Sequence, residues 1–268
     1  MLPEPTELSE PRDPLEPRES REPFEPRESF IPFKPSLAAR AVVLLEVILC
    51  SDYPTQLALS AVFAPFGLTA SGHDGTLHIG FVVALSLLDT ALLVGLILVF
   101  LYAHGERPKE IFLGRRSIAA EVSYGVPLIL TAILIGIAVL SSVQAFAPWL
   151  HTVPINPLGR LIRSPRDAGL FALVVIVAGG VREEIQRAFL LHRFEVWLGG
   201  RAVGLIVASA AFGAGHLVQG MDAVIATGLL GAFWGFVYLR RRSVVAPMVS
   251  HAGFDLLQVA QLLVGGRR

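Results

Sequence analysis

Residues 168–191 read AGLFALVVIVAGGVREEIQRAFLL, an apolar run that passes without a break into charged residues. An apolar segment of about 20 residues is long enough to cross the hydrocarbon core of a bilayer as a helix. The rest of the chain has a similar character, since 53% of its 268 residues are hydrophobic, 16% are charged and the mean hydropathy is +0.62. Soluble domains of this length are more polar. The sequence therefore predicts an integral membrane protein.

Seven apolar segments are candidates for membrane-spanning helices: 38–66, 78–103, 118–148, 168–191, 203–219, 223–239 and 244–265. The first and third exceed one span, and each contains a proline, Pro54 or Pro127, at which a helix can kink. We therefore expect an all-α fold, a polytopic transmembrane bundle of about seven helices. It would occupy residues 37–268, with the chemically distinctive motifs at 168–265.

Residues 1–36 differ from the rest of the chain. They contain half of its 18 prolines, nine acidic and five basic residues, and a short imperfect repeat, EPRES, at 16–20 and 25–29. So much proline and charge with so little apolar content cannot offset the entropy lost on folding. We expect a disordered tail, and not a cleavable signal peptide, because no basic segment leads directly into an apolar core.

Basic residues gather after the second and sixth apolar segments, at Arg107, Lys109, Arg115, Arg116, Arg240, Arg241 and Arg242. The loop at 67–79 has neither Lys nor Arg, so the positive-inside rule places the basic loops in the cytoplasm. This pattern fits a multi-pass protein of the bacterial inner membrane. We expect the lipid bilayer as its surroundings and no nucleic acid among its partners. Cys50 is the only cysteine, which excludes an intramolecular disulfide and a thiolate metal cage.

Charged residues end the stretch at 168–191. On a helix, Glu183 and Glu184 lie four and three residues before Arg187, so both carboxylates can reach its guanidinium. A charge at mid-bilayer costs about 2.5 to 3.5 kcal/mol even on the most lenient scale, so each needs a partner or a function. Taken alone, these residues are explained by an ion pair that anchors a helix end at the headgroups.

Two histidines follow in separate apolar segments. His216 comes after a stretch rich in glycine and alanine, which lets a neighbouring helix approach closely, so its ring is expected at a helix crossing. His251 and Asp255 lie four residues apart on one helix face, where the carboxylate can orient the ring or act beside it as a second ligand. Each is explained singly by ordinary hydrogen bonding. Together, carboxylates and imidazoles on three helices are groups that bind a metal or activate a water.

These motifs resemble the three signature motifs of the CAAX prenyl protease and bacteriocin-processing family of intramembrane metalloproteases, also called the Abi or CPBP family. They read EEIQR at 183–187, FGAGH at 212–216 and HAGFD at 251–255. The resemblance covers about the last hundred residues. The family usually has three residues between its Glu pair and the Arg, whereas here two intervene. Either Glu183 takes the second Glu place, with Arg182 in the first, or the Arg has moved.

The resemblance implies hydrolysis of a peptide bond within the membrane by a water that a glutamate activates. The substrate would be a peptide or protein, with or without an attached lipid. His216, His251 and Glu183 would hold a divalent metal, zinc above all, or the same groups would act without a metal. The implied catalytic residues are Glu183 as the base, Glu184, His216, His251 and Asp255, with Arg187 and Phe212 in support.

Two other interpretations use the same clusters. In the first, the chain is a non-catalytic immunity or scaffold protein with buried ion pairs; in the second, it is an ion-coupled transporter. The membrane part shows no internal repeat of the kind common in transporters. One geometric expectation opposes catalysis: a helix that enters near Arg201 would leave His216 about 20 Å from Glu183 along the bilayer normal. A tilted or re-entrant helix would be needed to bring them together.

Overall fold

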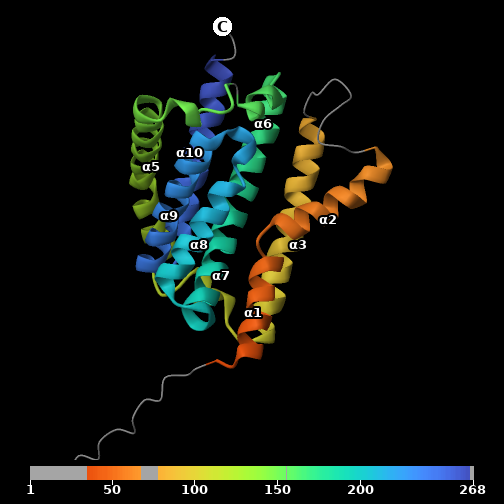
Figure 1. Ribbon diagram of the computed structural model, residues 1–268, viewed down its shortest axis with the longest axis vertical. Helices are drawn as coiled ribbons and strands as arrows, with labels where there is room; N and C mark the ends of the chain where they lie inside the picture. Colours follow the sequence, from red (N-terminus) through yellow and green to blue (C-terminus); the bar gives the residue numbers. More distant parts are fainter. Residues whose placement is uncertain (1–34, 68–77, 155, 266–268) are drawn as a thin grey trace, which may run out of the picture. The chain divides into compact units, whose positions relative to one another are not determined.

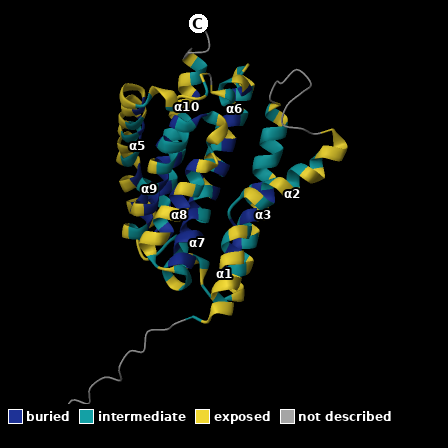
Figure 2. Cartoon of the chain, in the orientation of Figure 1, coloured by how far each residue is buried: buried dark blue, intermediate teal, exposed yellow. Residues whose placement is uncertain are grey.

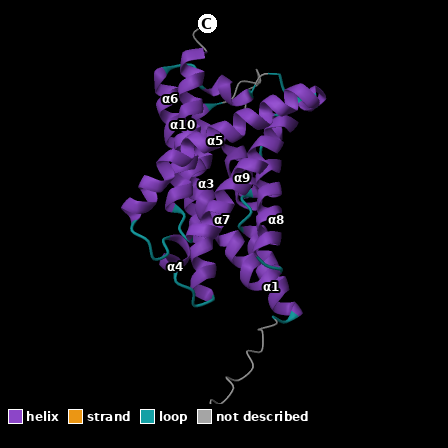
Figure 3. Ribbon diagram, turned by 90° about the vertical axis from the view of Figure 1, so that its left-hand side faces the viewer, coloured by secondary structure: helices purple, strands orange, loops and turns teal. Residues whose placement is uncertain are grey.

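The computed structural model describes residues 35–67, 78–154 and 156–265, so most of the predicted tail and of the loop at 67–79 lies outside the described residues. All regular structure in these ranges is helical, which confirms the predicted all-α fold (Figure 3). The α-helices are α1 (Leu37–Leu49), α2 (Tyr53–Phe63), α3 (Ile79–Ala103), α4 (Pro108–Phe112), α5 (Ile118–Phe146), α6 (Pro165–Val174), α7 (Glu183–Arg193), α8 (Arg201–Ala214), α9 (Met221–Arg241) and α10 (Val245–Gly265).

Within the described ranges, α3, α5 and α9 are each long and apolar enough to cross a membrane. Helices α1 and α2 meet this criterion together but are bent by 49° at the break between them, as in a broken span or a re-entrant loop. The break lies just before Pro54, at one of the two positions where the sequence allowed a kink, whereas α5 continues through Pro127. Apolar side chains of α5 such as Leu134 and Ile137 are exposed, and Figure 2 shows exposed residues along the outer side of this helix. Such a surface suits lipid. The number of crossings stays a prediction.

The stretch that begins the motif region forms a longer helix than predicted. Helical backbone runs unbroken from Pro165 to Leu198, because π-helical turns at Val175–Arg182 and Phe194–Leu198 continue α6 and α7. The chain then reverses at Gly199 and Gly200, whose φ angles of 116° and 95° only glycine adopts readily. Helix α8 packs back along α7 (Figure 1).

This hairpin corrects the expected separation of about 20 Å. Glu183 lies sixteen residues before Gly199, and His216 lies sixteen residues after Gly200. Because the two arms are antiparallel and equally long, the two side chains return to the same level. From the sequence we expected Glu183 near the cytoplasmic end of its helix. In the structure the helical backbone continues for several turns beyond Glu183, to Leu198.

Helix α10 packs closely against α5 and against the π-helical segment Val175–Arg182. Two glycines permit the second contact. A Cβ atom on Gly180 would lie 2.7 Å from Cβ of Ala252, and one on Gly179 would lie 2.7 Å from Oδ2 of Asp255. Real Cβ atoms do not approach that closely, so only glycine allows α10 to bring Asp255 against this segment.

Ion pairs join the helix ends at the basic loops. Glu195, just after α7, receives hydrogen bonds from Arg242 at 2.6 and 2.8 Å and from Arg201 at 2.7 Å. Burial alone would raise the pKa of Glu195, but the two guanidinium groups outweigh it and lower the pKa to about 2. The carboxylate thus ties the end of the long helix to the start of α8 and the end of α9.

Candidate active site

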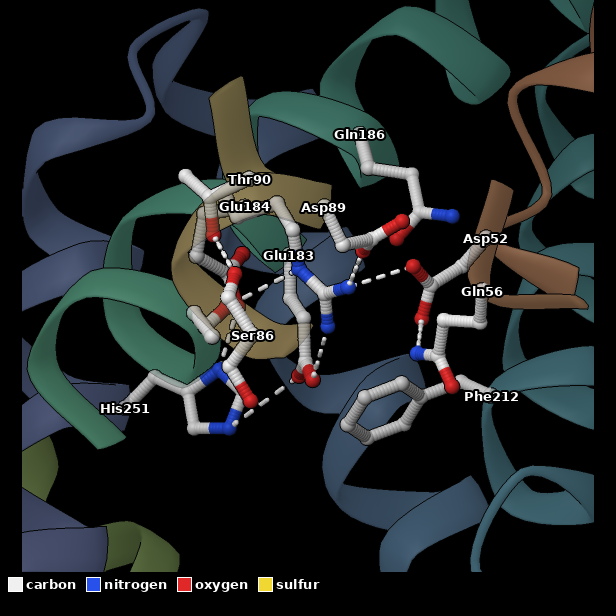
Figure 4. A network of polar contacts seen from close by, with 12 residues as sticks. Asp52, Gln56, Ser86, Asp89, Thr90, Glu183, Glu184, Gln186, Phe212 and His251 are labelled. Atoms are coloured by element: carbon white, nitrogen blue, oxygen red, sulfur yellow. Dashed lines mark hydrogen bonds and ion pairs between the residues drawn. The ribbon is translucent and has the colours of Figure 1, made fainter. Parts of the chain in front are cut away.

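Glu184 lies at the centre of a buried hydrogen-bonded group (Figure 4). One of its oxygens, Oε1, accepts from Arg187, one turn further along α7, and from Nδ1 of His251 on α10 at 2.8 Å. The guanidinium of Arg187 also lies over the ring of Phe212 on α8, 4.6 Å from its centroid. Glu184 therefore links α7 to α10, and it directs the Nδ1 hydrogen of His251 toward itself.

Neighbouring side chains set both the orientation of the His251 ring and the charges around it. Trp234 on α9 stacks against it with centroids 3.8 Å apart, and the indole Nε1 donates to Ser250 at 3.1 Å. The second ring nitrogen, Nε2, lies 3.6 Å from Asp255 and 3.8 Å from Glu183. From the sequence, Asp255 could orient this ring or act beside it as a second ligand. In the structure Glu184 makes the closer contact, at Nδ1, and Asp255 faces Nε2.

Glu183 points away from its neighbour and lines two cavities. Its side chain is 18% exposed, against 1% for Glu184. A cavity of about 540 Å³ and another of about 360 Å³ are both lined by Glu183, Arg182 and His216. Glu183 thus lies where the two cavities adjoin, and its carboxylate is accessible to a water or a substrate.

The two glutamates have different arginine partners. Glu184 pairs with Arg187, whereas Oε1 of Glu183 accepts from Nη2 of Arg182 at 3.2 Å. The sequence allowed both carboxylates to reach Arg187. They diverge because consecutive helical residues are rotated by about 100° from each other.

His216 lies beside the same space, two residues after α8 ends at Ala214. Its Nδ1 is 2.9 Å from the carbonyl oxygen of Phe212, and since a carbonyl only accepts, Nδ1 carries the hydrogen. The Phe212 ring lies edge-on to both imidazoles, with its centroid 4.9 Å from that of His216 and 5.9 Å from that of His251. Phe212 therefore separates the two histidines while holding both at the cavity wall.

The seven residues singled out from the sequence come together in the structure. Glu183, His216, His251 and Asp255 line the larger cavity, Arg187 and Phe212 line the smaller one, and Glu184 lies behind this wall.

The side chains as placed do not form a zinc site. In the part of the chain that the structure describes, no group of three or more His, Cys, Asp or Glu side chains could hold a metal ion. The predicted ligands Glu183, His216 and His251 share a cavity wall but do not converge on one point, as a tetrahedral zinc centre requires. We derive no step through a metal, and zinc stays a prediction.

Two aspartates that the sequence analysis missed complete the site. Arg182 is 5% exposed, and its Nη1 donates to both Asp52, at the break between α1 and α2, and Asp89, on α3 (Figure 4). The side-chain amide of Gln56 donates to the other oxygen of Asp52 at 2.7 Å. A lone carboxylate inside the apolar segment 78–103 was a signal of the same kind as the three clusters, and it would have identified Asp89.

Residues 165–257 match the family model described as type II CAAX prenyl endopeptidase Rce1-like. The predicted resemblance is confirmed. No curated protein and no solved structure matches the chain. The match runs from the start of α6 into α10 and includes the seven predicted site residues, whereas Asp52 and Asp89 precede it. It supports a CAAX-protease-like intramembrane endopeptidase in general.

Proposed function

We propose that this protein is a membrane-embedded endopeptidase in which Glu183 is the general base. The observation that carries the proposal is the divergence of the two glutamates. Glu184 is sequestered by Arg187 and His251, while Glu183 meets both cavities with one oxygen turned toward Nε2 of His251. A base must reach the proton that it removes, and of the two glutamates Glu183 is the one that borders the cavities.

The proposed reaction needs two proton transfers and two supporting hydrogen bonds, all within this site. Glu183 takes a proton from a water in the cavity, and the resulting hydroxide attacks the carbonyl carbon of the scissile bond. His251, when protonated at both nitrogens, donates Nε2–H to the developing oxyanion and keeps Nδ1–H on Glu184. Glu183 then returns its proton to the departing amine. His216 offers the free Nε2 of its ring to a substrate N–H.

The substrate proposed is a peptide or protein reached within the bilayer, with or without an attached lipid, and the proposed location is the bacterial inner membrane. The larger cavity has apolar walls around the reactive groups, including Phe171, Val175 and Leu230. Apolar surroundings would exclude bulk water from the reaction and strengthen the electrostatic contacts within it.

The decisive experiment compares new peptide termini in membranes by mass spectrometry. Membranes with the wild-type protein, with Glu183→Ala and with an exposed control, Glu110→Gln, are prepared at matched expression. We expect termini that appear with the wild type and the control and disappear with Glu183→Ala. Identical termini in all three would contradict the proposal and favour a scaffold or transporter. A parallel arm with a zinc chelator tests the predicted metal, since a zinc enzyme would lose the same termini.

A further inference from the structure

Arg182 has five N–H groups, and the structure gives partners for four. Its Nε donates to the carbonyl oxygen of Ala178 at 3.4 Å, and Nη1, which carries two hydrogens, donates to Asp52 and Asp89. Nη2 donates to Glu183 at 3.2 Å. With Nη1 fully occupied by the two aspartates, Glu183 meets the guanidinium through one nitrogen and one oxygen.

The single contact is unusual for these two groups. A guanidinium and a carboxylate favour a bidentate pair with two parallel N–H···O bonds. Such a pair would occupy both oxygens of Glu183. In the structure Oε1 faces Arg182, while Oε2 lies 3.8 Å from Nε2 of His251. Arg182 and Glu183 therefore do not form the stronger, bidentate pair, and other contacts of the guanidinium must prevent it.

Asp52 and Asp89 are the groups that hold it. Asp89 is fully buried, one of its oxygens is on Arg182, and its Oδ1 has no hydrogen-bond partner among the described residues. Asp89 therefore meets Arg182 through one of its two oxygens. Asp52 adopts φ 79°, in the left-handed region that favours glycine, and Gln56 fixes its second oxygen. Both come from elements outside the segment that resembles the protease family.

We propose that Asp52 and Asp89 are positioning residues, which occupy Nη1 of Arg182 and thereby keep Oε2 of Glu183 free to activate water. This inference rests on the proposed endopeptidase function. It assigns the front half of the chain a part in catalysis, since α3 and the break between α1 and α2 supply the restraint.

The restraint on Arg182 is electrostatic, because acidic groups surround its guanidinium. Three carboxyl groups, on Asp52, Asp89 and Glu183, surround one guanidinium, and that of Asp89 is fully shielded from solvent. The other titratable or charged groups around Glu183 include His251 and Asp255 of α10, Glu184 and Arg187 of α7, and His216, just after α8. Neutral amides in place of the aspartates would leave Glu183 as the strongest partner of Arg182. The pair would then become bidentate.

The test uses the double variant Asp52→Asn/Asp89→Asn, which keeps the size of both side chains and removes their charge. The probe is a synthetic peptide that spans a bond cleaved by the wild type but not by Glu183→Ala. We expect kcat to fall about 10- to 100-fold, the range for a misplaced catalytic group, with KM within about twofold of the wild-type value. Loss of substrate binding would instead raise KM.

The matched control is Glu46→Gln. Glu46 lies on α1, is 5% exposed and pairs with Arg193 and His104, so the change removes a buried carboxylate from the front half without touching Arg182. Thermal unfolding in detergent is recorded for each variant. We expect the control to keep the wild-type kcat even where its unfolding midpoint falls as far as that of the double variant.

A third variant separates restraint from general destabilisation. Adding Arg182→Gln to the double variant removes the guanidinium that would capture Glu183 and leaves an uncharged cluster. We expect this triple variant to recover most of the lost kcat. Wild-type kcat in the double variant, or a triple variant no faster than the double, would overturn the inference. Failure of the proposed function is distinct, since the wild type would then match Glu183→Ala.

Discussion

At the scale of single residues, Glu183 and Glu184 show how adjacent, identical side chains acquire different roles. Successive positions on a helix point about 100° apart, so one carboxylate meets α10 while the other meets the cavities. Glu184 has the structural part, because it balances the buried charge of Arg187 and holds His251. Glu183 is left with the accessible position that a base requires.

This difference predicts unequal losses of stability when each glutamate is replaced. Glu184→Ala leaves Arg187 buried without its carboxylate, so we expect a loss of about 3 kcal/mol in unfolding free energy and loss of activity. Glu183→Ala should abolish cleavage and change stability by less than about 1 kcal/mol, since its side chain borders open space. Denaturant unfolding in detergent measures both. Equal destabilisation by the two changes would contradict the assignment of roles.

These residues could be identified from the sequence, but the separate roles of Glu183 and Glu184 could not. Motif spacing places Glu183, Glu184 and His251 in one site, as the structure confirms for their proximity. Which carboxylate meets His251 depends on the rotation of α7 relative to α10, and spacing along one helix carries no information about that. Asp89 is a different case, because its isolation in an apolar segment was visible in the sequence and its partner was not.

At the scale of the elements, the contact of α10 with the π-helical segment before α7 sets the position of Asp255. We predict that Gly180→Ala forces these segments apart, since the new Cβ would lie 2.7 Å from that of Ala252. Overpacking of this kind costs about 1 to 3 kcal/mol, and the shift of α10 should lower kcat at least tenfold.

The control for this prediction is Gly169→Ala, on α6 of the same long helix. A Cβ at that position would have no atom within 4 Å, so the change should leave activity intact and favour the helix slightly. Both variants are compared by thermal unfolding and by cleavage rate. A harmless Gly180→Ala would mean that α10 is free to move without cost to the site.

The ion pairs that join the ends of α7, α8 and α9 should make the stability of the protein depend on pH in the acidic range. The pKa of Glu195 falls from its ordinary 4.5 to about 2, because the effect of Arg242 and Arg201 exceeds that of burial. A carboxylate with a lowered pKa stabilises the fold fully above its ordinary pKa and loses that contribution as pH falls toward the lowered value. The difference in unfolding midpoint between wild type and Glu195→Gln should therefore be constant above pH 5 and shrink between about pH 4.5 and 2. A pH-independent difference would rule out the ion pairs as its source.

At the scale of the whole molecule, the family resemblance and the site have different extents. The match covers residues 165–257, while Arg182 within it is held by carboxylates from α3 and from the break between α1 and α2. The sequence predicted the helical class and most helix positions from apolar length alone. It could not predict the assembly of the two halves, because the contacts between them join single residues more than ninety positions apart.

The hairpin of α7 and α8 imposes a length constraint on any variant of this protein. One residue inserted into either arm would move Glu183 or His216 by about 1.5 Å along the axis and rotate it by about 100°. Such an insertion would separate the pair, whichever arm received it. Residues added between Gly199 and Gly200 would leave both arms unchanged. Insertions, whether natural or engineered, should therefore preserve the site when they lie between Gly199 and Gly200, and disrupt it when they lie in either helical arm.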